Sequence, residues 1–141
     1  MRRPLLHLLT LLVLLGGSAR AGLEGAMTRV LYATGLAKQS GFRVSDFSAD
    51  GVLKPGETVV LRFTFSSGVA YRLIVAGCED CTDLDAALYD EKGKLLARDK
   101  DPGAVAVIEK TPEWTGTYFL KITMQKSAPA GAHYFVQYVY D

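Results

Sequence analysis

The sequence predicts an all-β fold: an antiparallel β-sandwich of about eight strands, of the jelly-roll or Greek-key type, preceded by one short N-terminal α-helix. Three observations predict it. From residue 42 onward, apolar side chains recur at every second position, as in half-buried strands. Turn-forming residues separate these segments at the short intervals typical of sandwiches. No alternation of strands with helical segments exists, which excludes a parallel α/β fold.

Residues 1–21 predict a secretory signal peptide. Arg2 and Arg3 give a basic start, an apolar run of about a dozen residues follows, and Ala19-Arg20-Ala21 offers small residues at the −3 and −1 positions of a cleavage site. The run is about half as long as the roughly 20 apolar residues of a membrane-spanning helix. We therefore expect cleavage after Ala21, export to the periplasm or the medium, and no membrane span in the mature chain.

The charge of the mature chain excludes some partners. Residues 1–21 hold three of the 16 basic residues and none of the 15 acidic ones, so their removal leaves a net charge of about −2. A nearly neutral surface gives no electrostatic reason to expect nucleic acid or an anionic membrane as partner. The remaining chain, of about 120 residues, is long enough for one domain with an adequate core.

Residues 22–41 predict one amphipathic helix. Lys38 near its end suits the helix dipole, and Gly41 favours a stop. The apolar face has to cover either the sandwich or a partner protein, and the sequence leaves both open. The side chains of this face follow the spacing i, i+4, i+7 and i+8: Leu23, Met27, Val30 and Leu31.

Residues 42–141 form the predicted sandwich domain. Residues 59–65 and 69–75 alternate most clearly, with Gly68 as the turn between them. Asp90-Glu91-Lys92-Gly93 has hairpin chemistry, because glycine adopts the left-handed conformation that the return strand requires. The other expected strands are 43–49, 84–88, 94–98, 104–109, 118–124 and 133–140.

Three segments in order resemble the bacterial pre-peptidase C-terminal domain. They are Leu53-Lys54-Pro55-Gly56-Glu57, the acidic strand and hairpin of residues 82–99 (TDLDAALYDEKGKLLARD), and the corner of residues 111–122 (TPEWTGTYFLKI). The resemblance covers roughly residues 50–125. It implies a secreted, jelly-roll-like sandwich that serves as a targeting, substrate-binding or maturation module. It also implies a calcium site near the acidic strand, since some relatives bind calcium there.

The corner before the late strand has a physical rationale of its own. Pro112 cannot continue a strand ladder, and Gly116 permits a sharp bend. Tyr118 then opens the next strand, where a tyrosine can bury its ring while its hydroxyl binds backbone at the corner. We therefore expect Pro112, Gly116 and Tyr118 to have structural roles.

An acidic cluster is the candidate metal site: Asp80, Asp83, Asp85, Asp99 and Asp101. Residues i and i+2 of a strand point to one side, so pairs at this spacing can converge on a hard cation such as calcium. The alternative is that these acids are solvated turn formers, which the lack of an EF-hand-like loop favours. Calcium is the only cofactor that the sequence indicates.

Cys78-Glu79-Asp80-Cys81 predicts a structural loop disulfide, because export places the pair in an oxidising compartment. The surrounding carboxylates oppose thiolate formation, which disfavours a redox site. Zinc needs three or four ligands, and the mature chain has one histidine, His133. That histidine begins the last strand, where we expect it to be exposed at the edge of the sheet.

No catalytic centre is visible. The sequence holds no G-x-S-x-G or H-E-x-x-H motif, and we expect no enzymatic activity. Trp114 is the candidate ligand contact, because an exposed tryptophan can stack on a sugar or anchor a protein. Tyr134, Tyr138 and Tyr140 alternate along the last strand, which is typical of cross-strand packing.

Two hypotheses of function follow. The first is a non-catalytic, exported binding or accessory module that engages a protein or a glycan through its loops and is stabilised by calcium. The second is a structural or assembly component of an envelope or secreted complex, docking through its N-terminal helix.

Overall fold

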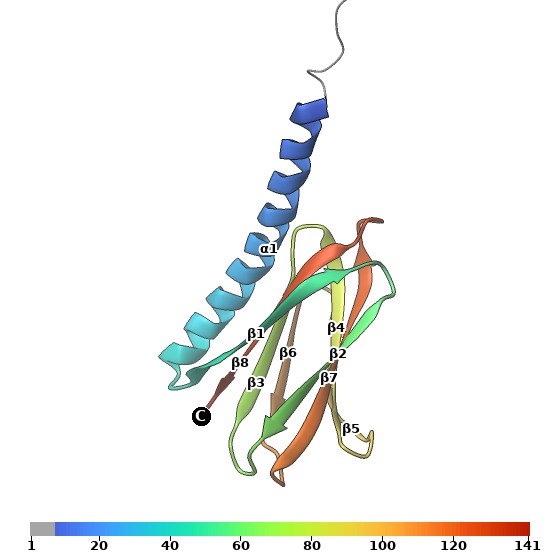
Figure 1. Ribbon diagram of the computed structural model, residues 1–141. Coiled ribbons are helices and arrows are strands. Elements are labelled where there is room, and N and C mark those ends of the chain that lie inside the picture. The colour runs from blue at the N-terminus through green and yellow to red at the C-terminus, as the bar shows by residue number, and fades with distance from the viewer. Residues whose placement is uncertain (1–7) are drawn as a thin grey trace, which may run out of the picture.

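The computed structural model describes the backbone of residues 8–141 and the side chains of residues 22–141. One helix precedes eight strands in two antiparallel four-stranded sheets, which confirms the predicted sandwich (Figure 1). The strand order is β1-β8-β3-β6 in sheet A and β2-β7-β4-β5 in sheet B, the arrangement of a jelly roll. The elements are α1 (Leu8–Gln39), β1 (Arg43–Leu53), β2 (Thr58–Phe65), β3 (Tyr71–Gly77), β4 (Cys81–Asp90), β5 (Leu95–Asp99), β6 (Val105–Lys110), β7 (Gly116–Ser127) and β8 (Ala132–Tyr140).

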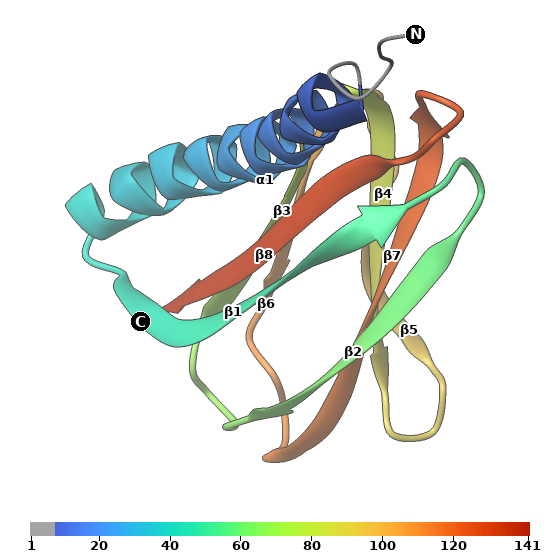
Figure 2. The same ribbon diagram turned by 45° about the horizontal axis from the view of Figure 1, so that its top comes forward.

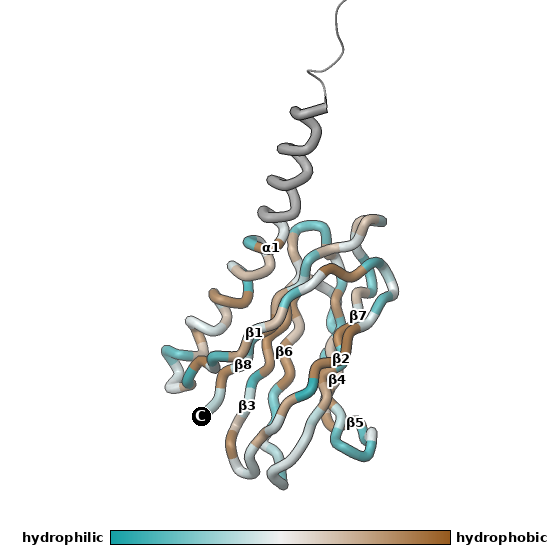
Figure 3. Tube along the Cα trace, viewed as in Figure 1, coloured by the Kyte–Doolittle hydropathy of each residue, from teal (hydrophilic) through white to brown (hydrophobic). Residues whose placement is uncertain are grey.

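The core fills the space between the two sheets. Alternate residues of each strand point inward, so the period of two in the sequence becomes two facing apolar surfaces. Figure 3 shows hydrophobic stretches along the strands and hydrophilic ones at most turns. The largest fully buried side chains between the sheets are Tyr118, Phe65, Leu73, Leu84, Leu88, Ile108, Leu120, Ile122, Met124, Val75 and Val136.

Helix α1 lies against the outer face of sheet A, across β8 and β3 (Figure 2). Ala26, Val30 and Ala37 are buried on the contact side, whereas Leu31 and Leu36 are about half exposed on the other. The helix therefore covers the sandwich, which answers the question that its apolar face left open. The outer face of sheet B has no such helix among the described residues.

Helix α1 begins earlier than predicted, at Leu8 rather than near residue 22. The expected signal peptide spans residues 1–21, whose side chains lie outside the described part of the chain, so it stays a prediction. Within that part, no helix combines the length and the hydropathy that crossing a membrane requires.

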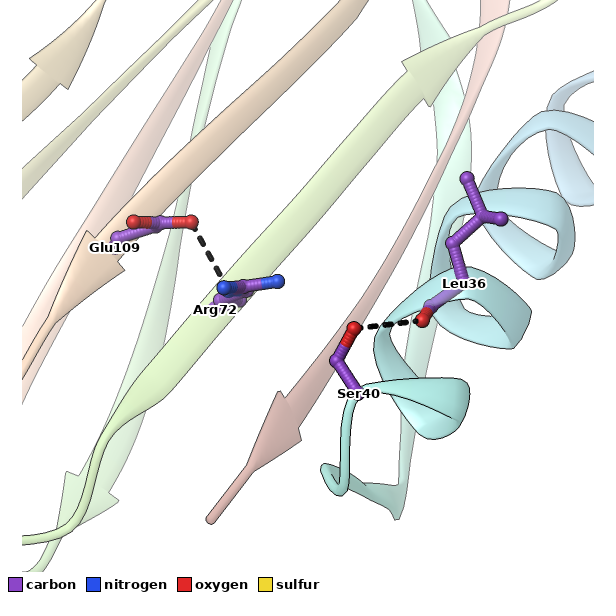
Figure 4. A network of polar contacts seen from close by, with 4 residues as sticks. All are labelled: Leu36, Ser40, Arg72 and Glu109. Atoms are coloured by element: carbon purple, nitrogen blue, oxygen red, sulfur yellow. Dashed lines mark hydrogen bonds and ion pairs between the residues drawn. The ribbon is translucent and has the colours of Figure 1, made fainter.

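The junction of α1 and β1 is held by both backbone and side chains. Gly41 has a φ of 97°, and the N–H of Phe42 donates to the carbonyl of Ala37 (3.1 Å), which closes the helix end. The Arg72 guanidinium lies 4.3 Å from the centre of the Phe42 ring and forms an ion pair with Glu109 (2.9 Å; Figure 4). These contacts fix where β1 enters sheet A.

One expectation about the last strand is wrong. β8 lies between β1 and β3, inside sheet A rather than at its edge. His133 is half-buried beneath α1, since a Cβ built on Gly22 would come within 2.7 Å of its Cδ2. The prediction that His133 is exposed rested on its place at the start of a strand. That place does not show whether the strand lies at the edge or inside the sheet.

Candidate binding site at one end of the sandwich

Three connections meet at the end of the sandwich that carries the predicted corner. They are the β2–β3 turn, the β4–β5 hairpin turn and the β6–β7 loop, at the lower end in Figure 1. The N–H of Gly68 donates to the carbonyl of Pro112 (2.9 Å), and the N–H of Ser67 donates to Thr115 Oγ1 (2.9 Å). These bonds tie the β2–β3 turn to the β6–β7 loop.

The corner residues build a rigid support for Trp114. The Tyr118 hydroxyl donates to the carbonyl of Trp114 (2.6 Å), and the two rings stack with their centres 6.1 Å apart. Burial raises the pKa of Tyr118, and the carboxylates of Asp90 and Glu91 act in the same direction. Trp114 itself stays 43% exposed, held in place but open to a partner.

Pro112 and Gly116 have the positions in this corner that the sequence indicates. Pro112 is buried in the β6–β7 loop, and Gly116 opens β7. A Cβ on Gly116 would come within 2.7 Å of Glu91 Oε1, so the loop and the β4–β5 turn approach each other closely there. This approach brings the two connections together beside Trp114.

Two adjoining hollows surround the indole, and we call them together the Trp114 cleft. One, of about 100 Å³, lies between the β4–β5 hairpin and the β6–β7 loop, and the other, of about 450 Å³, lies along the hairpin turn. Lys94 and Trp114 line both. The remaining lining residues are Leu96, Lys110, Pro112, Glu113, Tyr118, Asp90, Glu91 and Lys92.

The acids of the cleft mostly fold the hairpin. Asp90 Oδ1 accepts hydrogen bonds from the N–H groups of Lys92 and Lys94, both at 2.9 Å. Glu91 Oε1 accepts one from the N–H of Thr117 (2.7 Å). The ion pair formed by the described side chains is Arg72–Glu109, which includes none of the residues that line the cleft. The cleft is therefore lined by charges of both signs: the ammonium groups of Lys92, Lys94 and Lys110, and the carboxylates of Asp90, Glu91 and Glu113.

The five acids of the candidate metal site are not brought together. Asp99 uses both carboxylate oxygens in the β5–β6 connection, accepting from the N–H groups of Asp101 and Val107 (both 2.9 Å). Asp80 and Asp101 are exposed. Among the described residues, no three side chains of the types His, Cys, Asp and Glu are placed to share a metal ion.

Asp83 and Asp85 remain from that prediction. They lie on the outer face of β4, and the Oδ1 atom of each is screened from solvent without a hydrogen-bond partner among the described residues. Asp85 Oδ2 accepts a hydrogen bond from Gln125 Nε2 (3.0 Å). Calcium stays a prediction, now on these two carboxylates.

The two cysteines lie at the end of the sandwich opposite the Trp114 cleft, Cys78 in the β3–β4 turn and Cys81 at the start of β4. Both are buried, and the structure contains them as free thiols, so it does not show the predicted disulfide. The N–H of Cys81 donates to the carbonyl of Cys78 (3.0 Å), which places the pair across one tight turn. Burial raises the pKa of the Cys81 thiol, while the charge of Arg29 opposes that shift.

The sequence missed Lys94, Leu96 and Lys110 as cleft residues. Lys94 follows the hairpin glycine Gly93, so its place beside a turn could be predicted from the sequence. Its approach to Trp114 depends on the strand order, because β5 and β6 belong to different sheets. Nothing in a single sequence states which turns of a jelly roll share an end.

Comparisons with known proteins concern the fold. No family model matches the chain, and no curated protein matches it. Among solved structures, it is similar to the pre-peptidase C-terminal domain of a collagenase from Bacillus anthracis: TM-score 0.52 and 19% identity, over 65% of this chain and 87% of that one. It is also similar to PliG of Aeromonas hydrophila, a periplasmic inhibitor of g-type lysozyme: TM-score 0.52 and 12% identity, over 72% and 90%. The chain therefore has the fold of a pre-peptidase C-terminal domain, as the sequence resemblance predicts.

Proposed function

We propose that this protein is a non-catalytic, exported accessory module that binds a protein partner through the Trp114 cleft. The observation that carries the proposal is an exposed tryptophan held rigidly between two connections of the sandwich. Rigid aromatic anchors lose little conformational entropy on binding and commonly dominate the binding energy of protein interfaces. The export signal predicted for residues 1–21 places the partner outside the cytoplasm.

The charges of the cleft favour a protein over a neutral glycan. Sugar hydroxyls are recognised largely by carboxylate and amide acceptors, and the Asp90 and Glu91 oxygens described above already accept backbone N–H groups. Three lysines and three carboxylates line the cleft around Trp114, so it offers charges for ion pairs rather than unpaired acceptors alone. Such a surface fits a protein segment that offers an apolar side chain flanked by charged side chains of both signs.

The absence of catalysis belongs to the same proposal. His133, the histidine among the described side chains, lies beneath α1 rather than in a cleft. The lining of the Trp114 cleft includes no histidine, cysteine or serine, and its carboxylates Asp90 and Glu91 accept backbone N–H groups. The similarity to a lysozyme inhibitor is consistent with a module that acts by binding.

The test is site-specific photo-crosslinking in the producing cell. A crosslinking residue at Glu113, beside the cleft, should capture a defined partner protein. The same residue at Thr58, exposed at the other end of β2, serves as control. Replacing Trp114 with alanine should abolish the Glu113 crosslink and weaken binding to the purified partner at least tenfold. Equal crosslinking from both positions, or an unaffected Trp114→Ala variant, would refute the proposal.

A second candidate, an assembly component that docks through α1, is favoured by one observation. Leu31, Tyr32 and Leu36 form an exposed apolar strip on the side of the helix that faces away from sheet A. A crosslinker at Tyr32 distinguishes the two candidates. Capture of the partner from Tyr32 and not from Glu113 favours assembly through the helix.

A further inference from the structure

A second pocket opens at the same end of the sandwich, on the side of sheet A. It has a volume of about 290 Å³ and lies where β1 enters the sheet. Three tyrosines from two neighbouring strands and one phenylalanine from β1 supply its walls, with one carboxylate beside them. The lining residues are Ser45, Asp46, Phe47, Tyr71, Tyr138 and Tyr140.

The rings form a cluster around this pocket, which we call the tyrosine cage. The ring centres of Tyr71 and Tyr138 are 5.9 Å apart, those of Tyr138 and Tyr140 6.3 Å, and those of Tyr71 and Tyr140 6.5 Å. The planes of each pair are inclined to one another by 38–67°. Phe47 adds a fourth ring, 6.1 Å from Tyr138. At these distances the rings pack against one another, and together they line one side of the pocket.

The backbone of β1 creates the cage. The register of β1 on β8 shifts between Val44 and Ser48, so the residues between them leave the regular ladder. Gln137 Nε2 donates to the carbonyl of Ser45 (3.3 Å), and the Ser45 hydroxyl donates to the carbonyl of Phe47 (3.3 Å). These bonds fix the irregular segment and hold Asp46 and Phe47 beside the tyrosines.

The tyrosines are equally well fixed. The N–H of Ser66 donates to the Tyr71 hydroxyl oxygen (2.9 Å), and the Phe65 ring stacks on Tyr71 with centres 4.1 Å apart. Phe63 meets Tyr138 edge to face, at 5.8 Å. The cage is therefore part of the core at its inner end and needs little rearrangement to receive a ligand.

The groups that line the cage are ones that attract cations, and Asp46 is the charged residue among them. Aromatic faces carry the negative part of the ring quadrupole, and the tyrosine hydroxyl oxygens are acceptors. Burial, together with Tyr71, Tyr140 and the charge of Asp46, raises the pKa of Tyr138. Arg43 stands opposite Tyr140 in the strand register, yet the cation–π contact among the described side chains is that of Arg72 with Phe42. The cage thus has the surroundings of a cation site.

We propose that the tyrosine cage binds an organic cation with N–H donors, namely an arginine or lysine side chain of the partner protein. The ring faces attract the charge, Asp46 pairs with it, and the hydroxyl oxygens accept its hydrogen bonds. The inference rests on the proposed function only for the origin of the cation, because the cage itself is separate from Trp114.

The test is a titration followed by NMR on the whole protein. The probe is Nα-acetyl-arginine amide. The control compound is Nα-acetyl-citrulline amide, which has nearly the same shape and no charge. The arginine compound should shift the signals of residues 45–47 and 138–140 in a saturable way. It should bind at least tenfold more tightly than the citrulline compound. Equal binding of the two, or no saturable shift, would overturn the proposal.

Two variants sharpen this test. Asp46→Asn should weaken arginine binding about tenfold, while Asp50→Asn, at an exposed carboxylate farther along β1, should not change it. Both positions are exposed, so neither change should prevent folding. An unaffected Asp46→Asn variant contradicts the proposal.

The origin of the cation is tested separately. A short glycine peptide with one central arginine should bind at least as tightly as a free guanidinium-bearing amine. Tighter binding of the free amine would reject the protein side chain as the occupant. Trp114→Ala should leave all these affinities unchanged, so failure of the cage and failure of the Trp114 cleft give different results.

Discussion

Arg29 of helix α1 donates hydrogen bonds from Nη1 to the carbonyl of Cys78, at 3.1 Å, and to that of the preceding glycine, at 2.7 Å. The helix is thereby attached to the β3–β4 turn, 49 residues away in the sequence. The two carbonyls lie where β3 ends and the β3–β4 turn begins, so Arg29 adds a charged donor at the point where the strand ladder stops. This contact and the apolar face of α1 together fix the helix on sheet A.

Replacing Arg29 with methionine should lower the free energy of unfolding by about 2 kcal/mol, since hydrogen bonds from a charged donor are lost while the aliphatic packing is largely kept. Urea denaturation measures the change. Arg98→Met, at an exposed arginine of β5, is the matched control and should change stability by less than about 0.5 kcal/mol. Equal effects of the two changes would show that the Arg29 bonds contribute nothing specific.

Adjacent residues of α1 test how the helix packs. Val30 is fully buried against sheet A, and Leu31 is 52% exposed. Val30→Ala should cost roughly 2 kcal/mol, from lost apolar burial and the cavity left behind. Leu31→Ala should stay within about 0.5 kcal/mol, as surface changes usually do. The opposite order in a denaturant titration would mean that the helix presents its other face to the sandwich.

Calcium should stabilise the protein only through Asp83 and Asp85. A metal bound by the native state alone raises the melting temperature as its concentration rises. The rise at millimolar calcium should disappear in the double variant Asp83→Asn/Asp85→Asn. It should persist in Asp101→Asn, which removes an exposed carboxylate. A melting temperature that does not respond to calcium in the wild type removes the calcium prediction.

Stability should fall at alkaline pH. Burial raises the pKa values of Tyr118, Tyr134 and Tyr138 above the value of about 10 that tyrosine has in an unfolded chain. The fold thus favours the neutral hydroxyls, so their contribution is complete below about pH 10 and is lost as the pH rises through the folded-state values. Urea midpoints between about pH 8 and 11 measure the decline. Tyr134→Phe should make it shallower, and an unchanged slope would contradict this explanation.

The cysteine pair gives a prediction about oxidation. Protein recovered from an oxidising compartment should be lighter than the reduced chain by two hydrogens, because Cys78 and Cys81 stand across one turn. Reduction should then cost about 2 kcal/mol of stability, the chain-entropy value for so short a loop. The variant Cys78→Ser/Cys81→Ser should not respond to reductant. An unchanged mass would show that both thiols stay free.

The sequence predicts the architecture because strand alternation is local. The period of two in residues 59–65 and 69–75 becomes β2 and β3, and the hairpin of Asp90–Gly93 forms where its glycine requires it, with a φ of 79° at Gly93. The end of α1 before Gly41 is local in the same way. Each of these features depends on residues that are close in the sequence, so a local sequence pattern is enough to predict it.

The binding surfaces are much harder to predict from the sequence, because they combine residues from strands and loops that are far apart in the chain. Tyr134, Tyr138 and Tyr140 look alike in the sequence, yet the ring of Tyr134 packs under Gly51, at the other end of β8 from the cage. The ring partners of Tyr138 come from β1, β2 and β3, and the one on β1 is placed by a register shift that no turn residue indicates. Arg29 likewise finds its acceptors only through the placement of α1.

The place where β8 ends has a practical consequence for experiments. Tyr140 lines the cage, and the N–H of Asp141 donates to the carbonyl of Ala70 (3.0 Å), which holds this end of the polypeptide at the rim. A purification tag or fluorescent fusion attached after Asp141 would leave the domain at the mouth of that pocket. A histidine-rich or lysine-rich tag there would compete with any cationic ligand in the same molecule. Such a tag should be removed before affinities are compared, or deliberately kept as a tethered competitor.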